Sequence, residues 1–461
     1  MKIFSERKTS AKAKNLFRQT EFDNILKCVH CGLCLDSCPT YRELGDEKDS
    51  PRGRLFLMRG LWEGELELED SVIKPLSRCL DCRACESACP SGVPYGELLE
   101  KTRGIILENT NQTLKERILR KIFLKNIFCS TNLLILLSKL IKIYIISGIP
   151  KIITKTFFGN FFPKSFVFKQ YLIPDFSGKS FKIKYSKKNL GPLDQETKFQ
   201  NNIPRVGLFS GCIMDVSEEV IHSSTLTLLR YLGCEVYIPK DQSCWGALHV
   251  HSGDRKTSRK LALENLEAFK SFDLDAIITN AAGCGAQLKE YNLLFSDTTY
   301  KKRKNFSGFE KKVIDIMEFI YHHQDRLKSL DWRKEEETVL YDAPCHLIHA
   351  QQVNKNPQKI LKDLPGVTLE AIEDSEWCCG SAGIYNLCQP ELSTAILHRK
   401  TQSIFNALKN YSNATTLVTG NVGCLYQIRA GIKIKNIDIR VLHPIVFLAE
   451  RLIKNEPQKI P

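Results

Sequence analysis

The chain has 461 residues, more than one hydrophobic core usually supports, so the sequence predicts two or three domains. Eight of its 18 cysteines fall in two tight runs, a pattern that argues against a disulfide-bonded secreted protein and for metal ligation in a reducing compartment. The first 14 residues carry no apolar run before a cleavage site, so we expect a cytoplasmic protein that is at most peripheral on the inner face of the cell membrane.

Residues 20–105 form the first predicted domain and contain both cysteine runs. Residues 28–39 read CVHCGLCLDSCP and residues 79–90 read CLDCRACESACP, so each run has three cysteines separated by two residues and a fourth that precedes a proline. This is the spacing of two-cluster bacterial ferredoxins, in which the fourth cysteine of each run ligates the other cluster. We therefore predict an α-helical, ferredoxin-like domain that holds two 4Fe-4S clusters.

The crossed ligation assigns four thiolates to each cluster. The first set is Cys28, Cys31, Cys34 and Cys89, and the second is Cys38, Cys79, Cys82 and Cys85, with Pro39 and Pro90 turning the chain away beside the clusters. Crossing places the clusters near each other, so we expect an electron to pass between them without a diffusing carrier. Zinc is the alternative occupant of four thiolates, but zinc sites usually combine two CxxC units rather than use a run of four.

Residues 106–203 are predicted to form a basic, apolar helical segment that ends in a polar linker. Within residues 101–190, 15 Lys and 3 Arg stand against 3 acidic residues, a net charge of +15 that leaves the rest of the chain nearly neutral. Residues 133–149 are almost wholly apolar, but Lys139 and Lys142 interrupt them. Each lysine would cost about 2.5–3.5 kcal/mol at the centre of a bilayer, so we expect no membrane span.

Two interpretations of this segment stay open. As an interfacial helix it would bind anionic lipid through Lys139 and Lys142, with about 1 kcal/mol from each charge near the surface. As a linker it would keep its lysines in solvent and pack between domains. Nucleic acid is not an expected partner, because the aromatic residues within 157–162 cluster without interleaved arginines.

From residue 204 onward, short apolar runs alternate with amphipathic stretches, which is typical of α/β units around a mainly parallel sheet. The pattern occurs twice, over residues 204–325 and 336–455. The first half has expected strands at 205–211, 235–239 and 275–280 with helices at 215–232 and 257–271, and the second has strands at 338–344, 367–372 and 415–421 with helices at 356–363 and 391–408. Each half closes with a strand that runs into a helix, at 313–320 and 441–448. We predict two copies of one α/β domain related by a pseudo-twofold axis.

Cysteines recur at matching points of the two halves, where the expected strands end. Since parallel sheets gather their ligand-binding loops at the carboxyl ends of the strands, the second half is predicted to hold a further iron-sulfur cluster or a zinc ion. Its candidate ligands are Cys345, Cys378, Cys379 and Cys424. The first half keeps Cys212, Cys244 and Cys284 but has Trp245 in place of the second cysteine of the Cys-Cys-Gly loop, so its site is expected to be weaker or vestigial.

The remaining cysteines and the nearby histidines have simpler expected roles. Cys129, Cys234 and Cys388 have no counterpart in the other half, so we expect them to pack as small apolar side chains. Four histidines flank the loops and are expected to be hydrogen-bonded structural residues, although each has the chemistry to assist ligation or to move a proton. They are His249, His251, His346 and His349.

Several longer stretches carry a family resemblance. They are SPRGRLFLMRGLWEG between the cysteine runs, CLDCRACESACPSGVPYGELLE over the second run, and CWGALHVHSG, TNAAGCGAQLKEY, WCCGSAGIYNL and TGNVGC at the loops of the two halves. With them the chain resembles the iron-sulfur subunit of bacterial glycolate oxidase over almost its full length. Its C-terminal halves are similar to the cysteine-rich domains of heterodisulfide reductase and of lactate-utilisation proteins.

The resemblance implies an electron-transfer subunit of an oxidoreductase that acts on CH-OH groups. Its partners would be FAD-containing subunits that oxidise glycolate or a related 2-hydroxy acid, and the electrons would pass toward membrane quinone. The chain has no GxGxxG after a strand and no P-loop, so we expect it to oxidise no substrate alone.

Three rival interpretations remain. The iron-sulfur subunit of anaerobic glycerol-3-phosphate dehydrogenase has a similar layout, but HVHSG and NAAGCG favour the glycolate enzyme. A heterodisulfide-reductase-like thiol-disulfide enzyme would need a full thiolate set, which Trp245, Ala281 and Asn421 interrupt. A zinc-stabilised scaffold would dock partners through the C-terminal halves and carry no electrons.

Overall fold

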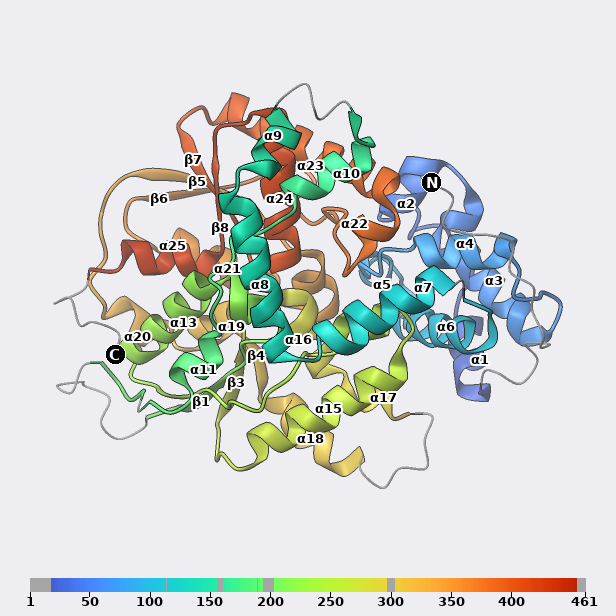
Figure 1. Cartoon of the computed structure of the whole chain (residues 1–461), viewed down its shortest axis with the longest axis horizontal. Helices are drawn as coiled ribbons and strands as arrows, with labels where there is room; N and C mark the ends of the chain where they lie inside the picture. The colour runs from blue at the N-terminus through green and yellow to red at the C-terminus, as the bar shows by residue number, and fades with distance from the viewer. Residues whose placement is uncertain are drawn as a thin grey trace.

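The computed structural model describes residues 18–112, 114–155, 161–188, 190–193, 203–296 and 303–453. In that part of the chain, short helices surround the two cysteine runs and form one end of the molecule, drawn in blue in Figure 1. They are α1 (Gln19–Leu26), α2 (Pro39–Leu44), the 3-10 turn η1 (Glu47–Asp49), α3 (Pro51–Glu63), α4 (Asp70–Arg78), α5 (Ala84–Ser87) and α6 (Tyr95–Asn109).

Helix α3 begins and ends where its sequence requires. Ser50 accepts a hydrogen bond from the Gly53 amide at 3.0 Å, and Pro51 fits the first turn. Gly64 ends the helix in a left-handed conformation with a φ of 76°. The buried face of α3 consists of Leu55, Met58 and Leu61, which form a small core with apolar residues of α4 and α6.

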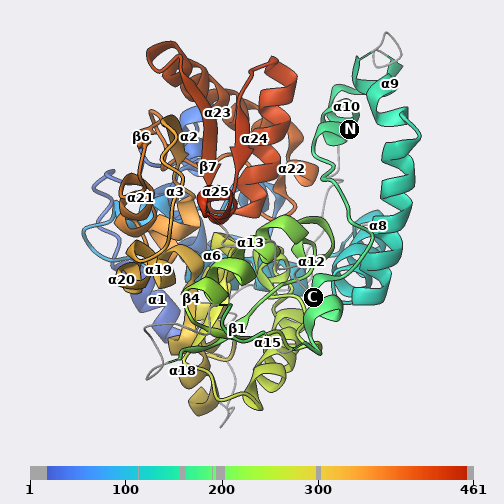
Figure 2. The same ribbon diagram turned by 90° about the vertical axis from the view of Figure 1, so that its left-hand side faces the viewer.

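The basic segment is helical and follows the outside of the molecule. Its elements are α7 (Leu114–Leu119), the π-helical η2 (Arg120–Ile127), α8 (Thr131–Ile146), α9 (Ile149–Lys155), α10 (Lys164–Tyr171) and α11 (Phe181–Tyr185). Figure 2 shows α8, α9 and α10 along one margin of the protein. In the described chain no single helix is long and apolar enough to cross a membrane, although η2 and α8, bent by 114°, reach that length and apolarity as a pair.

Two parallel four-stranded sheets form the C-terminal part, and their topologies are the same. The first has the order β2-β1-β3-β4 and the second the order β6-β5-β7-β8. The strands are β1 (Arg205–Leu208), β2 (Glu235–Tyr237), β3 (Ala276–Thr279) and β4 (Val313–Asp315), then β5 (Glu337–Asp342), β6 (Val367–Ala371), β7 (Ala414–Thr419) and β8 (Arg440–Leu442). The predicted fold class, a helical N-terminal domain followed by a duplicated α/β domain, is confirmed.

Helices cover both sheets in a matching order. The first repeat has α12 (Met214–Ser217), α13 (Glu219–Tyr231), α14 (Ala247–His251), α15 (Arg255–Lys270), α16 (Ala282–Lys289), α17 (Tyr291–Leu294), α18 (Arg303–Lys312), α19 (Ile316–His322) and α20 (Gln324–Lys328). The second has the π-helical η4 (His346–Ala350), α21 (Lys355–Lys362), α22 (Tyr385–Cys388), α23 (Pro390–Asn410), α24 (Val422–Lys435) and α25 (Pro444–Arg451). The predicted helix 215–232 is broken at Glu218, and the helices that follow β3 and β7 were not predicted.

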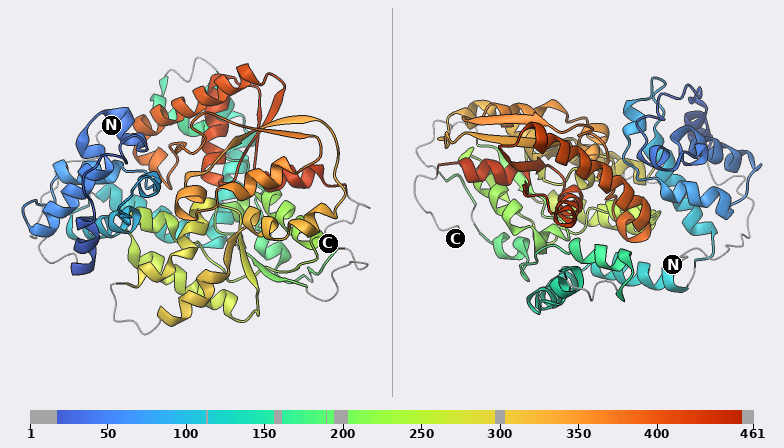
Figure 3. Two further views of the ribbon diagram at one scale, coloured as in Figure 1. Left: turned by 180° about the vertical axis from the view of Figure 1, so that it is seen from behind. Right: turned by 90° about the horizontal axis from the view of Figure 1, so that it is seen from above.

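The two repeats exchange a helix near their ends. α19, near the end of the first repeat, packs against α21 of the second, and α25, at the end of the second, packs against α13 of the first. One hydrophobic core therefore runs through both sheets. Figure 3 shows the N-terminal helices at one end of this double-sheet body, with α8 and α9 below it in the view from above.

Candidate metal centres

The first predicted cysteine quartet lines one cavity of the N-terminal domain. Cys28, Cys31, Cys34 and Cys89 lie on its wall together with Cys85. The loop reaches this shape through left-handed turns at His30 and Gly32, with φ of 55° and 87°. Burial raises the pKa of Cys34 to about 11, so this thiol needs a nearby cation to be held as a thiolate.

The second quartet lines a neighbouring cavity. Its wall contains Cys38, Cys79, Cys82 and Cys85, with Pro39 at the side. The structure thus brings together the two quartets that crossed ligation predicts, and because Cys85 lies on both walls the cavities adjoin. Pro90 is exposed, between two residues of the first cavity, Cys89 and Ser91, so only Pro39 of the two predicted prolines lines a cavity.

The second cavity contains a buried cation that sequence reasoning missed. The Arg54 side chain is wholly buried, with Nη1 3.9 Å from Cys38 Sγ and Nη2 donating to Asp49 Oδ1 at 3.1 Å. Tyr95 donates its hydroxyl to Cys79 Sγ at 3.5 Å. A signal was present, because Arg54 shares the helical stripe of Met58 and Leu61, where a charge is out of place unless it has a buried partner.

The donor geometry fits iron-sulfur clusters better than zinc. Tetrahedral zinc with Zn–S bonds of about 2.3 Å would hold four sulfurs about 3.8 Å apart. Among the described residues, however, no three cysteine sulfurs lie within 4.8 Å of one another. The larger spread leaves space for a cluster core between the thiols.

The four cysteines of the second repeat are also brought together. Cys345 follows β5, Cys378 and Cys379 lie on the loop after β6, and Cys424 is in α24 after β7. All four are buried, and the Cys379 and Cys424 sulfurs are 3.3 Å apart. Hydrogen bonds from Cys345 and Cys379 hold the pKa of Cys378 well below its usual range.

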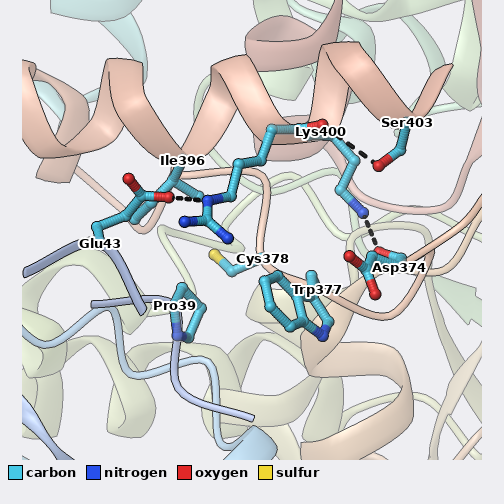
Figure 4. A pocket seen from close by; sticks show the side chains of 9 residues that line it. Pro39, Glu43, Asp374, Trp377, Cys378, Ile396, Lys400 and Ser403 are labelled. Atoms are coloured by element: carbon cyan, nitrogen blue, oxygen red, sulfur yellow. Dashed lines mark hydrogen bonds and ion pairs between the residues drawn. The ribbon is translucent and has the colours of Figure 1, made fainter. Parts of the chain in front are cut away.

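This second-repeat site lies directly beside the second N-terminal cavity. Cys82, Cys345 and Cys378 belong to one buried apolar cluster. Figure 4 shows Cys378 facing Pro39 across the domain boundary. A metal centre in the second repeat would therefore be the nearest neighbour of the second cluster on this side.

The first repeat gathers fewer thiols. Cys212, Cys244 and Cys284 follow β1, β2 and β3, and the neighbouring Cys244 thiol lowers the pKa of Cys212. Burial, and then the charge of Cys212, raise the pKa of Cys284. Trp245, in the place of a fourth thiol, is buried and packs on Gly211.

Asn421 connects the two repeats. Its Nδ2 is 3.4 Å from Cys424 Sγ, and its Oδ1 accepts a hydrogen bond from the Gly283 amide at 3.3 Å. Gly283 precedes Cys284, so Asn421 lies between Cys424 of the second repeat and the backbone next to Cys284 of the first.

Comparisons with known proteins match this arrangement. Residues 24–93 match the 4Fe-4S dicluster domain family, and residues 206–289 and 339–429 each match the cysteine-rich domain family. Over 437 residues the chain is 37% identical to the probable glycolate oxidase iron-sulfur subunit of Bacillus subtilis, covering 92% of this chain and 94% of the relative. The chain belongs to the family of glycolate oxidase iron-sulfur subunits. As a dicluster member of that family it carries two 4Fe-4S clusters.

Two further relatives extend this picture. The glycolate oxidase iron-sulfur subunit of Escherichia coli is 31% identical over 413 residues, which cover 88% of this chain and 90% of the relative. Lactate utilization protein A of an Exiguobacterium species is 27% identical over 242 residues, 52% of this chain and 95% of the relative.

In this glycolate oxidase subunit homologue, a buried lysine lies near the thiols of each repeat. Lys400 Nζ is 2.9 Å from Asp342 Oδ1. Against the effect of burial, the Asp342 carboxylate raises the pKa of Lys400, and the charges of Cys379 and Cys424 add to this. Figure 4 shows Lys400 reaching back from α23 toward Asp374, whose carbonyl oxygen accepts at 2.9 Å. Near the thiols of the first repeat, Lys182 of α11 donates a hydrogen bond to the Gln242 carbonyl. Burial lowers the pKa of Lys182, and the charges of Asp215, Cys212 and Cys244 oppose this effect.

The burial of these two lysines is not equally predictable from the sequence. Lys400 lies in a helical stripe with Ile396 and Ile404, so its burial could have been found from periodicity. Lys182 belongs to a segment that is distant in sequence from the first repeat, and no periodic pattern around it indicates that it is buried.

The four flanking histidines are buried or half-buried, and each has a hydrogen-bond partner, which for His346 Nδ1 is Cys345 Sγ at 3.6 Å. His251 lies 2.9 Å from Asp81 and 3.5 Å from Glu100, and although burial opposes it, these carboxylates raise the pKa of His251 to about 9. His349 Nδ1 bonds Ser87 at 2.8 Å, and His249 Nε2 bonds the Leu124 carbonyl at 2.8 Å. Burial lowers the pKa of His346 to about 3, so it stays neutral.

Proposed function

We propose that the chain relays electrons within a glycolate or related 2-hydroxy acid oxidase complex. Electrons would arrive from an FAD-containing partner subunit, cross the two 4Fe-4S clusters and leave toward membrane quinone. The observation that carries this proposal is the pair of cysteine-lined cavities that share Cys85 on their walls. Neighbouring clusters exchange electrons directly, and the names of the relatives give the class of reaction.

The protein's own residues would serve the clusters in two ways. Arg54 places a positive charge against the second quartet, where it offsets thiolate charge in a low-dielectric site. Leu55, Val93 and Tyr95 are buried and line the first cavity, which would keep water from its cluster. When bound, the clusters supply one-electron chemistry, and the chain provides their position and polarity.

The second repeat would extend the relay. Its four thiols adjoin the second cavity through Cys82 and Cys378, and Lys400 supplies a compensating charge. We infer that a further iron-sulfur cluster bound there is the exit from the N-terminal pair.

A helix that lies on the membrane surface would hold the chain close to membrane quinone. Helix α8 exposes an apolar stripe of Leu136, Leu140, Ile143 and Ile146, and Lys139 and Lys142 are exposed beside it. A helix with this arrangement can lie in a lipid interface, with its apolar side chains in the acyl boundary and its lysines at the headgroups.

The relay is tested by replacing one ligand. Cys34→Ser in the assembled complex should lose one of two N-terminal EPR-active centres and abolish quinone reduction, while Cys388→Ser, at an exposed thiol, should keep both. Quinone reduction at the wild-type rate in Cys34→Ser would refute the relay.

The membrane contact is tested separately. The pair Lys139→Glu and Lys142→Glu should detach the protein from anionic phosphatidylglycerol vesicles in a flotation assay. The control pair, Lys260→Glu and Lys270→Glu, changes the charge equally on the exposed surface of α15 and should still bind. Equal binding by the two pairs would contradict a role for α8.

A further inference from the structure

Cys129 lies next to the cysteine loop of the first repeat, although it belongs to the basic segment. It is at the turn between η2 and α8, and its Sγ is 3.2 Å from the Leu124 carbonyl oxygen and 3.6 Å from His249 Nε2. His249 is fully buried on α14, which follows the Cys244-Trp245-Gly246 loop directly. The turn thus docks against this loop.

The same turn lies on the side of the repeat that carries its thiols. Cys244 is in the loop against which the turn docks, and Trp245 of that loop packs on Gly211, the residue before Cys212. Cys284 follows β3, the strand next to β1, so it lies at the same edge of the sheet as Cys212. The turn therefore brings a fourth cysteine to the edge where the other three lie.

The two repeats differ in the number of thiols that their own loops supply. In the second repeat the fourth thiol is Cys379, which is 3.3 Å from Cys424. The first repeat has Trp245 at the equivalent position, so its own loop supplies one thiol fewer. The distant segment brings a thiol to the repeat that lacks one.

Two buried polar groups at this place have no partner in the described part of the chain. Trp245 Nε1 is one and His249 Nδ1 is the other, and both side chains are at most 2% exposed. Trp245 lies so close to Gly211 that a Cβ there would be 2.9 Å from its ring, which directs the indole toward the residue before Cys212. His249 Nε2 donates to the Leu124 carbonyl, so its Nδ1 carries no proton in the neutral ring. The Trp245 indole N–H is therefore the buried donor that a cluster sulfide or thiolate can accept.

We propose that Cys129, Cys212, Cys244 and Cys284 bind an additional iron-sulfur cluster, with the basic segment closing the site. Lys182 of the same segment would offset its negative charge, as Lys400 does in the second repeat. The segment would then be fixed to the first repeat by a metal centre as well as by packing. This site does not require the N-terminal clusters to carry electrons.

Metal content of the anaerobically purified full-length chain tests the site. Cys129→Ser should lose about four irons and about four sulfides per chain, and Cys388→Ser should lose none. The double variant Cys129→Ser/Cys212→Ser should lose no more than either single variant, because both thiols serve one centre. Unchanged iron in Cys129→Ser, or loss of one zinc instead, would overturn the proposal.

Alkylation of the wild-type chain gives a measurement that does not depend on how a variant folds. Cys129 should resist iodoacetamide in the as-isolated protein and become labelled after iron is removed by a chelator, whereas the exposed Cys388 should be labelled from the start. Rapid labelling of Cys129 before iron removal would overturn the proposal. The EPR signals of the N-terminal pair should persist in Cys129→Ser, which separates failure of this site from failure of the electron relay.

Discussion

A single buried cation near each group of thiols affects the stability and the reduction potential of the centre that those thiols hold. Arg54, Lys182 and Lys400 are all within the protein interior, and each is close to cysteines from two different loops. A thiolate-bound cluster is anionic, so a buried cation lowers the cost of taking it out of water. The same cation favours the reduced state, which carries one more negative charge.

Replacing Arg54 should affect both stability and redox behaviour. Arg54→Leu leaves the buried Asp49 with Arg78 alone, and we expect a loss of about 3 kcal/mol in unfolding free energy. The reduction potential of the second cluster should fall, measured by EPR-monitored titration. Arg59→Leu, on the exposed side of the same helix, should change stability by less than about 0.5 kcal/mol and leave the potential unchanged. Equal potentials in the two variants would contradict the role of Arg54.

His251 should make the contact between the N-terminal domain and the first repeat sensitive to pH. Its pKa is raised from 6.5 to about 9, so its contribution to stability is complete below about pH 6.5 and is lost as pH rises through 9. The shift corresponds to about 3 kcal/mol. We expect the difference in unfolding free energy between wild type and His251→Gln to be large at pH 6 and small at pH 10. A difference that does not change with pH would show that His251 is not charged in the fold.

Among the helices and strands, the elements that could be predicted are those that depend on a regular spacing of residues along the chain. The strands, the repeat and the two cysteine quartets depend on residue spacing, and the structure has them where the spacing indicates. The break of the predicted helix 215–232 at Glu218 was not visible, because Glu218 is buried and lies 3.5 Å from Arg429 of the other repeat. The sequence predicts Cys129 to be a packing residue because it has no counterpart in the other repeat. Its contact with His249 joins residues far apart in the chain, and local patterns carry no information about such contacts.

The exchanged helices make the two repeats one folding unit, which the sequence could not indicate. Phe447 of α25 is 1% exposed, and α25 packs on α13 of the other repeat. Phe447→Ala should cost about 3–5 kcal/mol and should speed amide hydrogen exchange in β1 and β3 as well as in β5 and β7. Phe405→Ala on the exposed side of α23 should cost less than about 1 kcal/mol. Faster exchange confined to the second repeat would show that the repeats fold separately.

At the scale of the whole molecule, the N-terminal domain is fastened to both repeats. Arg83, between two cysteines of the second run, donates to Glu290 of the first repeat at 2.5 and 2.8 Å. Tyr385 of the second repeat donates to the Arg78 carbonyl at 2.8 Å, and Arg399 pairs with Glu43. Arg83 itself lines the second cavity, so these contacts hold that end of the N-terminal domain against both repeats.

Breaking one contact should loosen the domain without emptying its clusters. Glu290→Gln leaves the Arg83 guanidinium, which is 5% exposed, without its main counter-charge, and unpairing a buried ion costs about 3–5 kcal/mol. We expect faster hydrogen exchange in α5, α6 and α16 while the iron content stays at the wild-type value, because none of the cysteines is altered. Glu267→Gln removes an exposed pair with Lys270 and should leave exchange unchanged. If Glu290→Gln exchanged like the wild type, the domain would be held by its apolar contacts alone, and the distance between centres would not depend on this ion pair.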